Sequence, residues 1–241
     1  MCTVTYLPTG NGNFLLTSNR DEAPHRSPEH ISSGRVNGQE LIFPRDTAAG
    51  GTWIAAADSG RVLCVLNGAF ELHERTPPYR RSRGLMALDY FAFPDFQAFL
   101  REYTFEGMEA FTMLIFEQGA IIDLRWDQSQ LHPRTFEASR PHVWSSVPLY
   151  PPPIRKKREQ WFAAWLAEHK HYAQEDILHW HQTAGEGDPW NDVVMNRDNR
   201  VRTVSITSIA KQDGRLDMQY HDLIRQRVTE AKIQLKGAAT T

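Results

Sequence analysis

The sequence predicts an α+β fold in which antiparallel sheets stack on each other and helices lie outside. Groups of strands with tight-turn signals between them occur in both halves of the chain, and helical stretches separate these groups. The strand expected at residues 62–66 is apolar at every position, which is typical of a strand covered on both faces. No internal repeat, linker or low-complexity tract divides the chain, so we expect residues 1–241 to form a single domain.

The first half is expected to form two hairpins followed by a helical stretch. Turn signals occur at Gly10-Asn11-Gly12 and at Asp58-Ser59-Gly60. They predict paired strands at residues 3–7 and 14–18, and at 52–57 and 62–66. From residue 82 to about 103, apolar side chains recur at helical spacing, with a break at Pro94. The adjacent glycines at 50 and 51 indicate a close backbone approach or a bulge.

The second half alternates strands with two helices. Strands are expected at residues 111–116, 120–126, 142–144, 193–195, 201–209 and 215–220, with tight turns at 118–119 and 213–214. A proline run at 151–153 starts a helix that continues to about residue 170, and a shorter helix is expected at 174–181. The tail after about residue 232 is small and polar, so we expect it to fray.

The composition argues against several classes of function. The chain is 41% hydrophobic with a formal net charge of −2, an ordinary globular balance that gives no overall attraction to nucleic acid. Its two cysteines, Cys2 and Cys64, form neither a disulfide framework nor a metal-site spacing, and no metal is expected. His179 and His181 are expected to be solvated or to cap a helix. We find no signal peptide and no apolar run of the roughly 20 residues that span a membrane, which predicts a cytoplasmic protein.

Cys2 is the first candidate for chemistry, because it directly follows Met1. Removal of the methionine would leave a residue with both a thiol and a free α-amine. Such an amine can act as general base for the nucleophile on the same residue. The ordinary pKa of the amine is about 7.7–8.0 and that of the thiol about 8.5, so both groups work near neutral pH. The alternative is that Cys2 is a small buried apolar residue.

A polar segment, Ser18-Asn19-Arg20-Asp21-Glu22, follows the second predicted strand. In an antiparallel hairpin, the end of this strand lies beside the start of the first strand and therefore beside Cys2. A carboxylate there can orient the α-amine, and a guanidinium lowers the pKa of a thiol. The alternative is a surface ion pair with an Asx turn.

Met1-Cys2 and the polar segment at 18–22 resemble the NRDE family, which is related to Transport and Golgi organisation protein 2. The resemblance covers roughly residues 1–220 and includes Ala49-Gly50-Gly51-Thr52-Trp53-Ile54-Ala55, Leu66-Asn67-Gly68-Ala69-Phe70, Pro78-Tyr79-Arg80-Arg81-Ser82-Arg83-Gly84, Trp144-Ser145-Ser146 and Thr203-Val204-Ser205-Ile206-Thr207. More distantly, the chain is similar to choloylglycine hydrolases and penicillin V acylases, which are N-terminal-nucleophile hydrolases. This implies a four-layer αββα sandwich of two antiparallel sheets, with Cys2 attacking an amide to form a thioester.

The resemblance also implies roles for individual residues. Asp21 stands where the acylases have the aspartate that orients the amine, and Asn67 where they have an oxyanion-hole asparagine. Ser146 replaces a second oxyanion asparagine, and removal of one oxyanion donor typically costs about 10²–10³ in rate. The acylases have an arginine at the position of Ser18. Here Arg20 lies two residues on and would share the same strand face.

Three hypotheses of function follow, of which the third is weaker than the other two. In the first, the chain is a hydrolase that cleaves an amide or thioester of a small acyl compound, with catalytic residues Cys2, Arg20, Asp21, Asn67 and Ser146 and substrate-binding residues Asn19, Trp53, Trp144 and Arg83. The two tryptophans are alternatively core residues.

In the second hypothesis, the fold carries haem or lipid without catalysis, as the resemblance implies for the family. Ser146 and Val204 stand where catalytic partners are expected, although Arg202 lies close to Val204. The chain has no motif for covalent haem attachment, and no cofactor is expected besides haem as cargo. A weaker third hypothesis is a protein-interaction module that uses the basic residues at 80–83. The sequence does not specify the oligomeric state.

Overall fold

The computed structural model describes residues 3–237, which contain two antiparallel sheets stacked face to face. The first sheet has seven strands in the order β10-β1-β2-β12-β13-β14, with β11 paired to β12. These strands are β1 (Thr3–Gly10), β2 (Asn13–Glu22), β10 (His142–Ser145), β11 (Asn196–Arg197), β12 (Val201–Gln212), β13 (Arg215–Asp222) and β14 (Arg227–Gln234). The N-terminal hairpin β1–β2 is thus central in this sheet.

The second sheet also has seven strands, and they follow one another in chain order from β3 to β9. They are β3 (Ile31–Val36), β4 (Gln39–Pro44), β5 (Ile54–Ala57), β6 (Val62–Asn67), β7 (Phe111–Glu117), β8 (Ala120–Trp126) and β9 (Leu131–Phe136). Strands β5, β6 and β7 are buried at almost every position, because they are covered on both faces.

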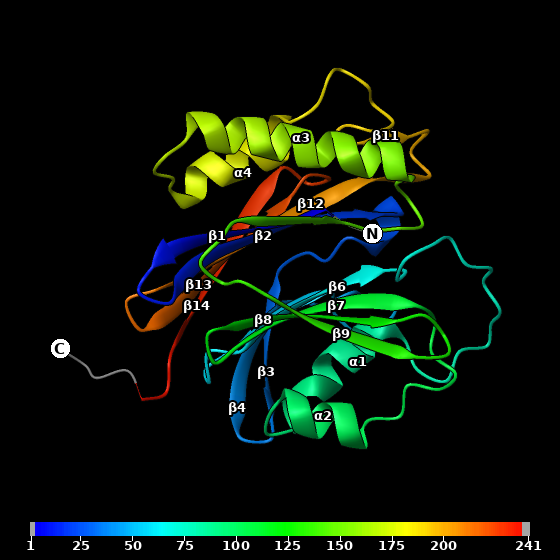
Figure 1. Ribbon diagram of the computed structural model, residues 1–241, viewed down its shortest axis with the longest axis vertical. Coiled ribbons are helices and arrows are strands. Elements are labelled where there is room, and N and C mark those ends of the chain that lie inside the picture. Colours follow the sequence, from blue (N-terminus) through cyan, green and yellow to red (C-terminus); the bar gives the residue numbers. More distant parts are fainter. Residues whose placement is uncertain (1–2, 238–241) are drawn as a thin grey trace.

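Helices cover the outer face of each sheet, which gives four layers (Figure 1). Helices α3 (Pro152–Glu168) and α4 (Gln174–Thr183) lie on the first sheet, and α1 (Arg83–Asp89) and α2 (Phe96–Glu102) lie on the second. Short 3₁₀ turns occur at Pro24–Arg26 and Tyr90–Ala92. One apolar cluster fills the space between the sheets, a second lies under α1 and α2, and a third lies under α3 and α4. The predicted α+β sandwich is therefore confirmed.

Several local predictions differ from the structure. Residues 193–195 were expected to form a strand, but they form a bend in which the Met195 amide donates to the Thr203 hydroxyl, and β11 starts only at Asn196. The tail expected to fray after about residue 232 is paired with β13 as far as Gln234. Strands β3, β4, β9 and β14 were not predicted from the sequence. None of the helices described is long and apolar enough to cross a membrane.

Candidate active site

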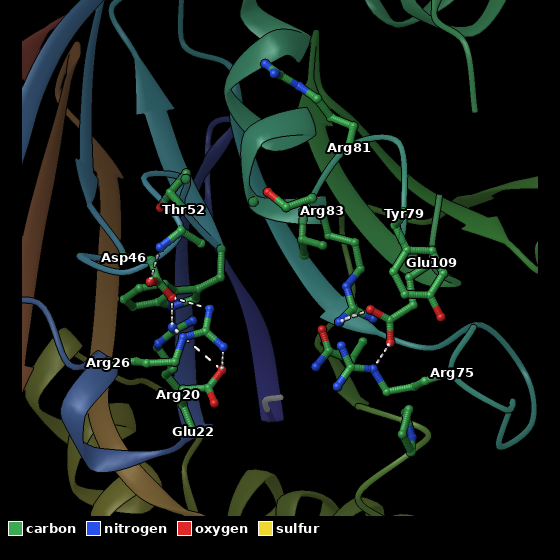
Figure 2. Close-up of a pocket in the computed structure, with 18 of the residues that line it drawn as sticks. Arg20, Glu22, Arg26, Asp46, Thr52, Arg75, Tyr79, Arg81, Arg83 and Glu109 are labelled. Atoms are coloured by element: carbon green, nitrogen blue, oxygen red, sulfur yellow. Dashed lines mark hydrogen bonds and ion pairs between the residues drawn. The ribbon is translucent and has the colours of Figure 1, made fainter. Parts of the chain in front are cut away.

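A cavity of about 550 Å³ opens where β2 ends and α1 begins. Figure 2 shows two charged groups that face each other across it. One contains Arg20, Glu22, Arg26 and Asp46, and the other contains Arg75, Arg83 and Glu109, with His73 beside them. Trp53 and Asn67 also line the cavity.

The first group surrounds the buried guanidinium of Arg20. Arg20 stacks on Trp53, with its Cζ 4.0 Å from the ring centroid, and hydrogen-bonds Asp46. Arg26 bridges the carboxylates of Asp46, at 2.7 Å, and Glu22, at 2.8 Å. Burial by itself would raise the pKa of Asp46, but the amide of Ala49 and the two guanidinium groups lower it below its ordinary value. The cluster is thus charge-balanced, with a dehydrated arginine held in one orientation.

Asp21 lies on the opposite face of β2, because side chains alternate along a strand. Its Oδ1 accepts a hydrogen bond of 2.7 Å from the Thr203 hydroxyl, and its Oδ2 accepts one from the Tyr150 hydroxyl. Both partners are buried, and burial next to Asp21 raises the pKa of Tyr150 well above its ordinary value. Tyr150 therefore stays protonated and remains a donor, so the carboxylate is fixed at the end of β2.

A buried polar network holds the start of β1 from the same side. The guanidinium of Arg158, from α3, is fully buried, donates to the Thr3 hydroxyl and to the carbonyl of Asp192, and stacks on the Tyr150 ring at 3.6 Å. Thr3 begins β1, and its backbone register opposite Ser145 is part of the sheet. The arginine thereby ties together the first described residue of the chain and the ring that holds Asp21.

Asn19 and His181 form a second part of this network. The Asn19 amide donates to the carbonyls of His181 and Val193, both at 3.1 Å, which directs its oxygen toward His181 Nδ1. His181 Nδ1 therefore carries the hydrogen, and Nε2 accepts from the Thr5 hydroxyl at 2.7 Å. Burial and the charge of Arg158 lower the pKa of His181 to about 3. The expectation of a solvated or capping His181 is wrong: it is a neutral core residue.

Asn67 ends β6 at the cavity wall and makes no side-chain hydrogen bond within residues 3–237. The next residue, Gly68, has φ of +77°, and a Cβ there would lie 2.6 Å from Pro148 Cδ. The glycine therefore lets the loop after β10 pack directly behind Asn67. The Ser146 hydroxyl in this loop is buried without a hydrogen-bond partner in the described part of the chain, and Ser146 is not among the residues that line the cavity.

The second charged group is built around Glu109. Its carboxylate pairs with Arg83 at 3.0 Å, with Arg75 at 3.2 Å and with His73 at 3.4 Å. Arg83 also donates to the carbonyl of Ala110. Two guanidinium groups thus share one carboxylate, which leaves this wall of the cavity with an excess of positive charge.

The structure brings together some of the predicted site residues and separates others. Arg20, Trp53, Asn67 and Arg83 line one cavity, and Asp21 lies at the same strand end. Asn19 faces the helices. Trp144 packs between the sheets against Phe136, at 5.6 Å, as its alternative core assignment expected. Cys2 lies outside the described residues, although its covalent neighbour Thr3 begins β1.

Sequence reasoning missed several residues of the site, namely Arg26, Asp46, Arg75, Glu109, Tyr150, Arg158 and Thr203. Asp46 precedes the double glycine, and its side chain caps the turn by accepting from the amides of Ala48 and Ala49. That Asx-turn pattern is a signal that could have found it. A Cβ on Gly51 would lie 2.3 Å from the Gly84 carbonyl carbon, so the close backbone approach expected at this pair is confirmed.

The family model for Transport and Golgi organisation 2 matches residues 1–222. The chain belongs to this family. Among curated proteins, none matches the sequence.

Solved structures of two enzymes are similar to this member of the family. A cysteine-to-alanine mutant of conjugated bile acid hydrolase from Clostridium perfringens superposes with a TM-score of 0.61 at 8% identity, covering 96% of this chain and 92% of that one. An arginine-to-leucine variant of the same hydrolase gives 0.61 at 9% identity, with 95% and 92% covered. A Caenorhabditis elegans N-acylethanolamine-hydrolyzing acid amidase ortholog gives 0.57 at 10% identity, with 86% and 92% covered. At these identities the likeness shows the fold, which is that of N-terminal-nucleophile hydrolases.

Proposed function

We propose that this protein is a cysteine N-terminal-nucleophile hydrolase that cleaves an amide bond of a small acyl compound carrying an anionic group. The observation that carries the proposal is the fixed carboxylate of Asp21 at the end of β2. It lies beside the strand that begins one residue after Cys2, and the preceding residue of β2, Arg20, lines the cavity together with Asn67. The fold shared with a conjugated bile acid hydrolase and with an N-acylethanolamine-hydrolyzing acid amidase ortholog supports a hydrolase.

In the proposed reaction, removal of Met1 exposes the α-amine of Cys2. The amine takes the thiol proton, and the thiolate attacks the carbonyl carbon of the amide. Collapse of the tetrahedral intermediate breaks the C–N bond, and the departing nitrogen receives the proton from the α-ammonium. Water then attacks the thioester with the amine again as base, and the acid is released. Asp21 would orient the α-amine throughout.

The oxyanion would be stabilised mainly from Asn67. Its side-chain amide faces the cavity without another hydrogen-bond partner in residues 3–237, so it is available as a donor. Arg20 would favour the thiolate, because its guanidinium is dehydrated and fixed on Trp53. Ser146 remains a predicted second donor, but its hydroxyl would have to act from behind the cavity wall.

The anionic group of the substrate would bind the wall formed by Arg75 and Arg83. These two cations share the single carboxylate of Glu109, so a ligand carboxylate or sulfonate completes their coordination. A neutral amide of equal size would lack this contact. We therefore expect N-acyl amino acids to be cleaved with a lower KM than the corresponding N-acylethanolamines.

Intact-mass analysis and thiol labelling test the nucleophile. We expect the purified protein to lack Met1 and to take up one equivalent of iodoacetamide at Cys2. Cys2→Ala should abolish this labelling, whereas the matched control Cys64→Ala should retain it, because Cys64 is fully buried between the sheets. Complete retention of Met1 would contradict the proposed mechanism.

Amine release from N-acyl amino acids tests the reaction. Asp21→Asn should lower kcat by about 10²-fold, within the range of general acid–base effects. Arg83→Gln should raise the KM for anionic amides and leave that for neutral amides unchanged. Lys157→Gln, on an exposed α3 side chain outside the cavity, serves as the control.

A second candidate function is the non-catalytic binding of haem. The observation that favours it is His73 at the cavity wall beside Arg75 and Arg83, since an imidazole can ligate haem iron and guanidinium groups can pair with its propionates. Haem titration should then give a saturable change in the absorption spectrum that His73→Ala weakens. A flat titration would remove this candidate and leave the hydrolase proposal untouched.

A further inference from the structure

A second cavity, of about 520 Å³, lies at the other end of the sandwich. It is bounded by the β1–β2 turn, the β7–β8 turn and the loop between β9 and β10. The first cavity lies at the Thr3 end of β1 and the second at the Gly10 end, which are separated by roughly 23 Å at the usual rise of a strand. The two cavities share no lining residue.

Three aromatic rings form one wall of this second cavity. Tyr6 and Phe116 stack at 5.4 Å with planes 13° apart, and Phe14 stacks on Phe116 at 5.6 Å. The Tyr6 hydroxyl already donates to the carbonyl of Ala138, so it offers no free polar group to a ligand. Burial raises the pKa of Tyr6 to about 12, so this wall stays uncharged. Stacked rings of this kind favour a planar apolar ligand.

The charge of the cavity comes from Lys211. Its ammonium lies 5.8 Å from the centroid of the Phe14 ring, and it makes no ion pair within the described residues. Glu117 is the acidic residue in the lining, but its carboxylate is turned toward the helices, where it accepts from the Tyr90 hydroxyl and the Phe96 amide. The cavity therefore combines an aromatic wall with one uncompensated cation.

We propose that this second cavity binds a small aromatic carboxylate, whose ring stacks beside Tyr6, Phe14 and Phe116 and whose carboxylate pairs with Lys211. The volume lies within the range of small-molecule sites, which are typically apolar with a few placed polar groups. The site is separate from the proposed hydrolase centre and does not depend on catalysis.

The test compares the binding of 2-naphthoate with that of its neutral isostere 2-naphthamide, for the wild type and for variants. Isothermal titration calorimetry on the full chain measures each affinity. We expect saturable binding of 2-naphthoate and about tenfold weaker binding of the amide, from loss of one charge-assisted hydrogen bond. Lys211→Gln should weaken binding of 2-naphthoate about tenfold and remove the difference between the two ligands. Lys232→Gln, an exposed lysine on β14, should change nothing.

Two further variants locate the site. Ser139→Trp, in the exposed loop at the cavity mouth, should block 2-naphthoate, whereas Arg83→Gln in the first cavity should leave its affinity unchanged. The proposal is overturned if 2-naphthoate does not bind saturably, if Lys211→Gln binds it as the wild type does, or if Arg83→Gln alone abolishes binding. Tighter binding of octanoate than of 2-naphthoate would overturn the aromatic preference.

Discussion

The two helix–sheet interfaces of this protein differ in the kind of contact that holds them. Under α1 and α2 the contact is mostly apolar and aromatic: Phe99 packs edge-on against Tyr90 at 5.2 Å and against Phe105 at 5.3 Å. A buried carboxylate, Glu117, accepts there from the Tyr90 hydroxyl and the Phe96 amide. Under α3 and α4, apolar packing is interrupted by buried polar side chains, among them Arg158 and His181, that hydrogen-bond to β1 and β2.

The difference in contacts agrees with the place of the candidate site, which lies at strand ends of the first sheet. Apolar contacts are non-directional, so most of the α1–α2 interface fixes the distance between helices and sheet and not the orientation of single groups. Its buried hydrogen bonds at Glu117 lie beside the second cavity and not at the candidate site. Buried hydrogen bonds are directional and costly to leave unmade, so the α3–α4 interface fixes side chains on the back of the N-terminal hairpin. These side chains include Thr3 and Asp21, at the strand ends where the candidate site lies. The polar interface is therefore part of the site's support.

Loss of Arg158 should have the largest effect. Arg158→Met leaves the Thr3 hydroxyl and the carbonyls of Asn191 and Asp192 without their donor. Each buried acceptor left unsatisfied costs about 1–3 kcal/mol, so we expect a loss of about 3–5 kcal/mol in the free energy of unfolding. Phe99→Ala in the apolar interface is the matched control, because a buried Phe→Ala change also costs about 3–5 kcal/mol. Urea unfolding measures both.

The two variants should differ in the chemistry of Cys2. At a temperature where both are folded, Arg158→Met should slow iodoacetamide labelling, because Thr3 and the Tyr150–Asp21 pair lose their anchor. Phe99→Ala should label at the wild-type rate. Equal labelling in the two variants would mean that the interfaces differ in composition but not in function.

His181 should give the polar interface a pH dependence that the apolar one lacks. Its pKa is lowered from 6.5 to about 3 by burial and by Arg158, so below pH 6.5 the unfolded chain binds a proton that the folded protein excludes. The contribution of His181 to the free energy of unfolding is fully present above about pH 6.5 and is lost as the pH falls toward 3. At pH 4 the protein should be less stable than at pH 7 by about 3 kcal/mol. His181→Gln should flatten this dependence, whereas Phe99→Ala should retain it. Urea unfolding at pH 7, 5 and 4 measures this dependence. If the free energy of unfolding of His181→Gln changes with pH as that of the wild type does, His181 is not the source of the dependence.

The sequence predicts the central strands of the fold better than its edges. Hairpin turns and fully apolar strands locate β1, β2, β5, β6, β7 and β8 to within a few residues. The missed strands β3 and β14 are mostly polar, because each lies at the edge of its sheet and leaves many side chains in water. Their pairing depends on the neighbouring strand and not on a pattern of their own.

Some residues of the candidate site could also be predicted from the sequence, and others could not. Arg20, Asp21 and Asn67 were found because they stand in local motifs at strand ends. The partners of Arg20 and Asp21, which are Asp46 and Tyr150, lie 26 and 129 residues away in the sequence, and Arg158 lies 155 residues from Thr3. Such pairs are set by the tertiary fold. No motif in the sequence around Tyr150 or Arg158 indicates that these side chains belong to the site.

Tyr150→Phe is the smallest and most selective change to the polar interface, because it deletes one hydroxyl and keeps the ring under Arg158. Loss of a hydrogen bond to a buried carboxylate should cost about 2 kcal/mol of stability. If the bond positions Asp21 for proton transfer, kcat for amide cleavage should fall about tenfold with little change in KM. Tyr172→Phe is the matched control, since its hydroxyl donates to the Pro8 carbonyl near the other end of β1. Equal kcat in both variants would assign Tyr150 to stability alone, whereas a selective fall in Tyr150→Phe would extend the polar interface into the catalytic cycle.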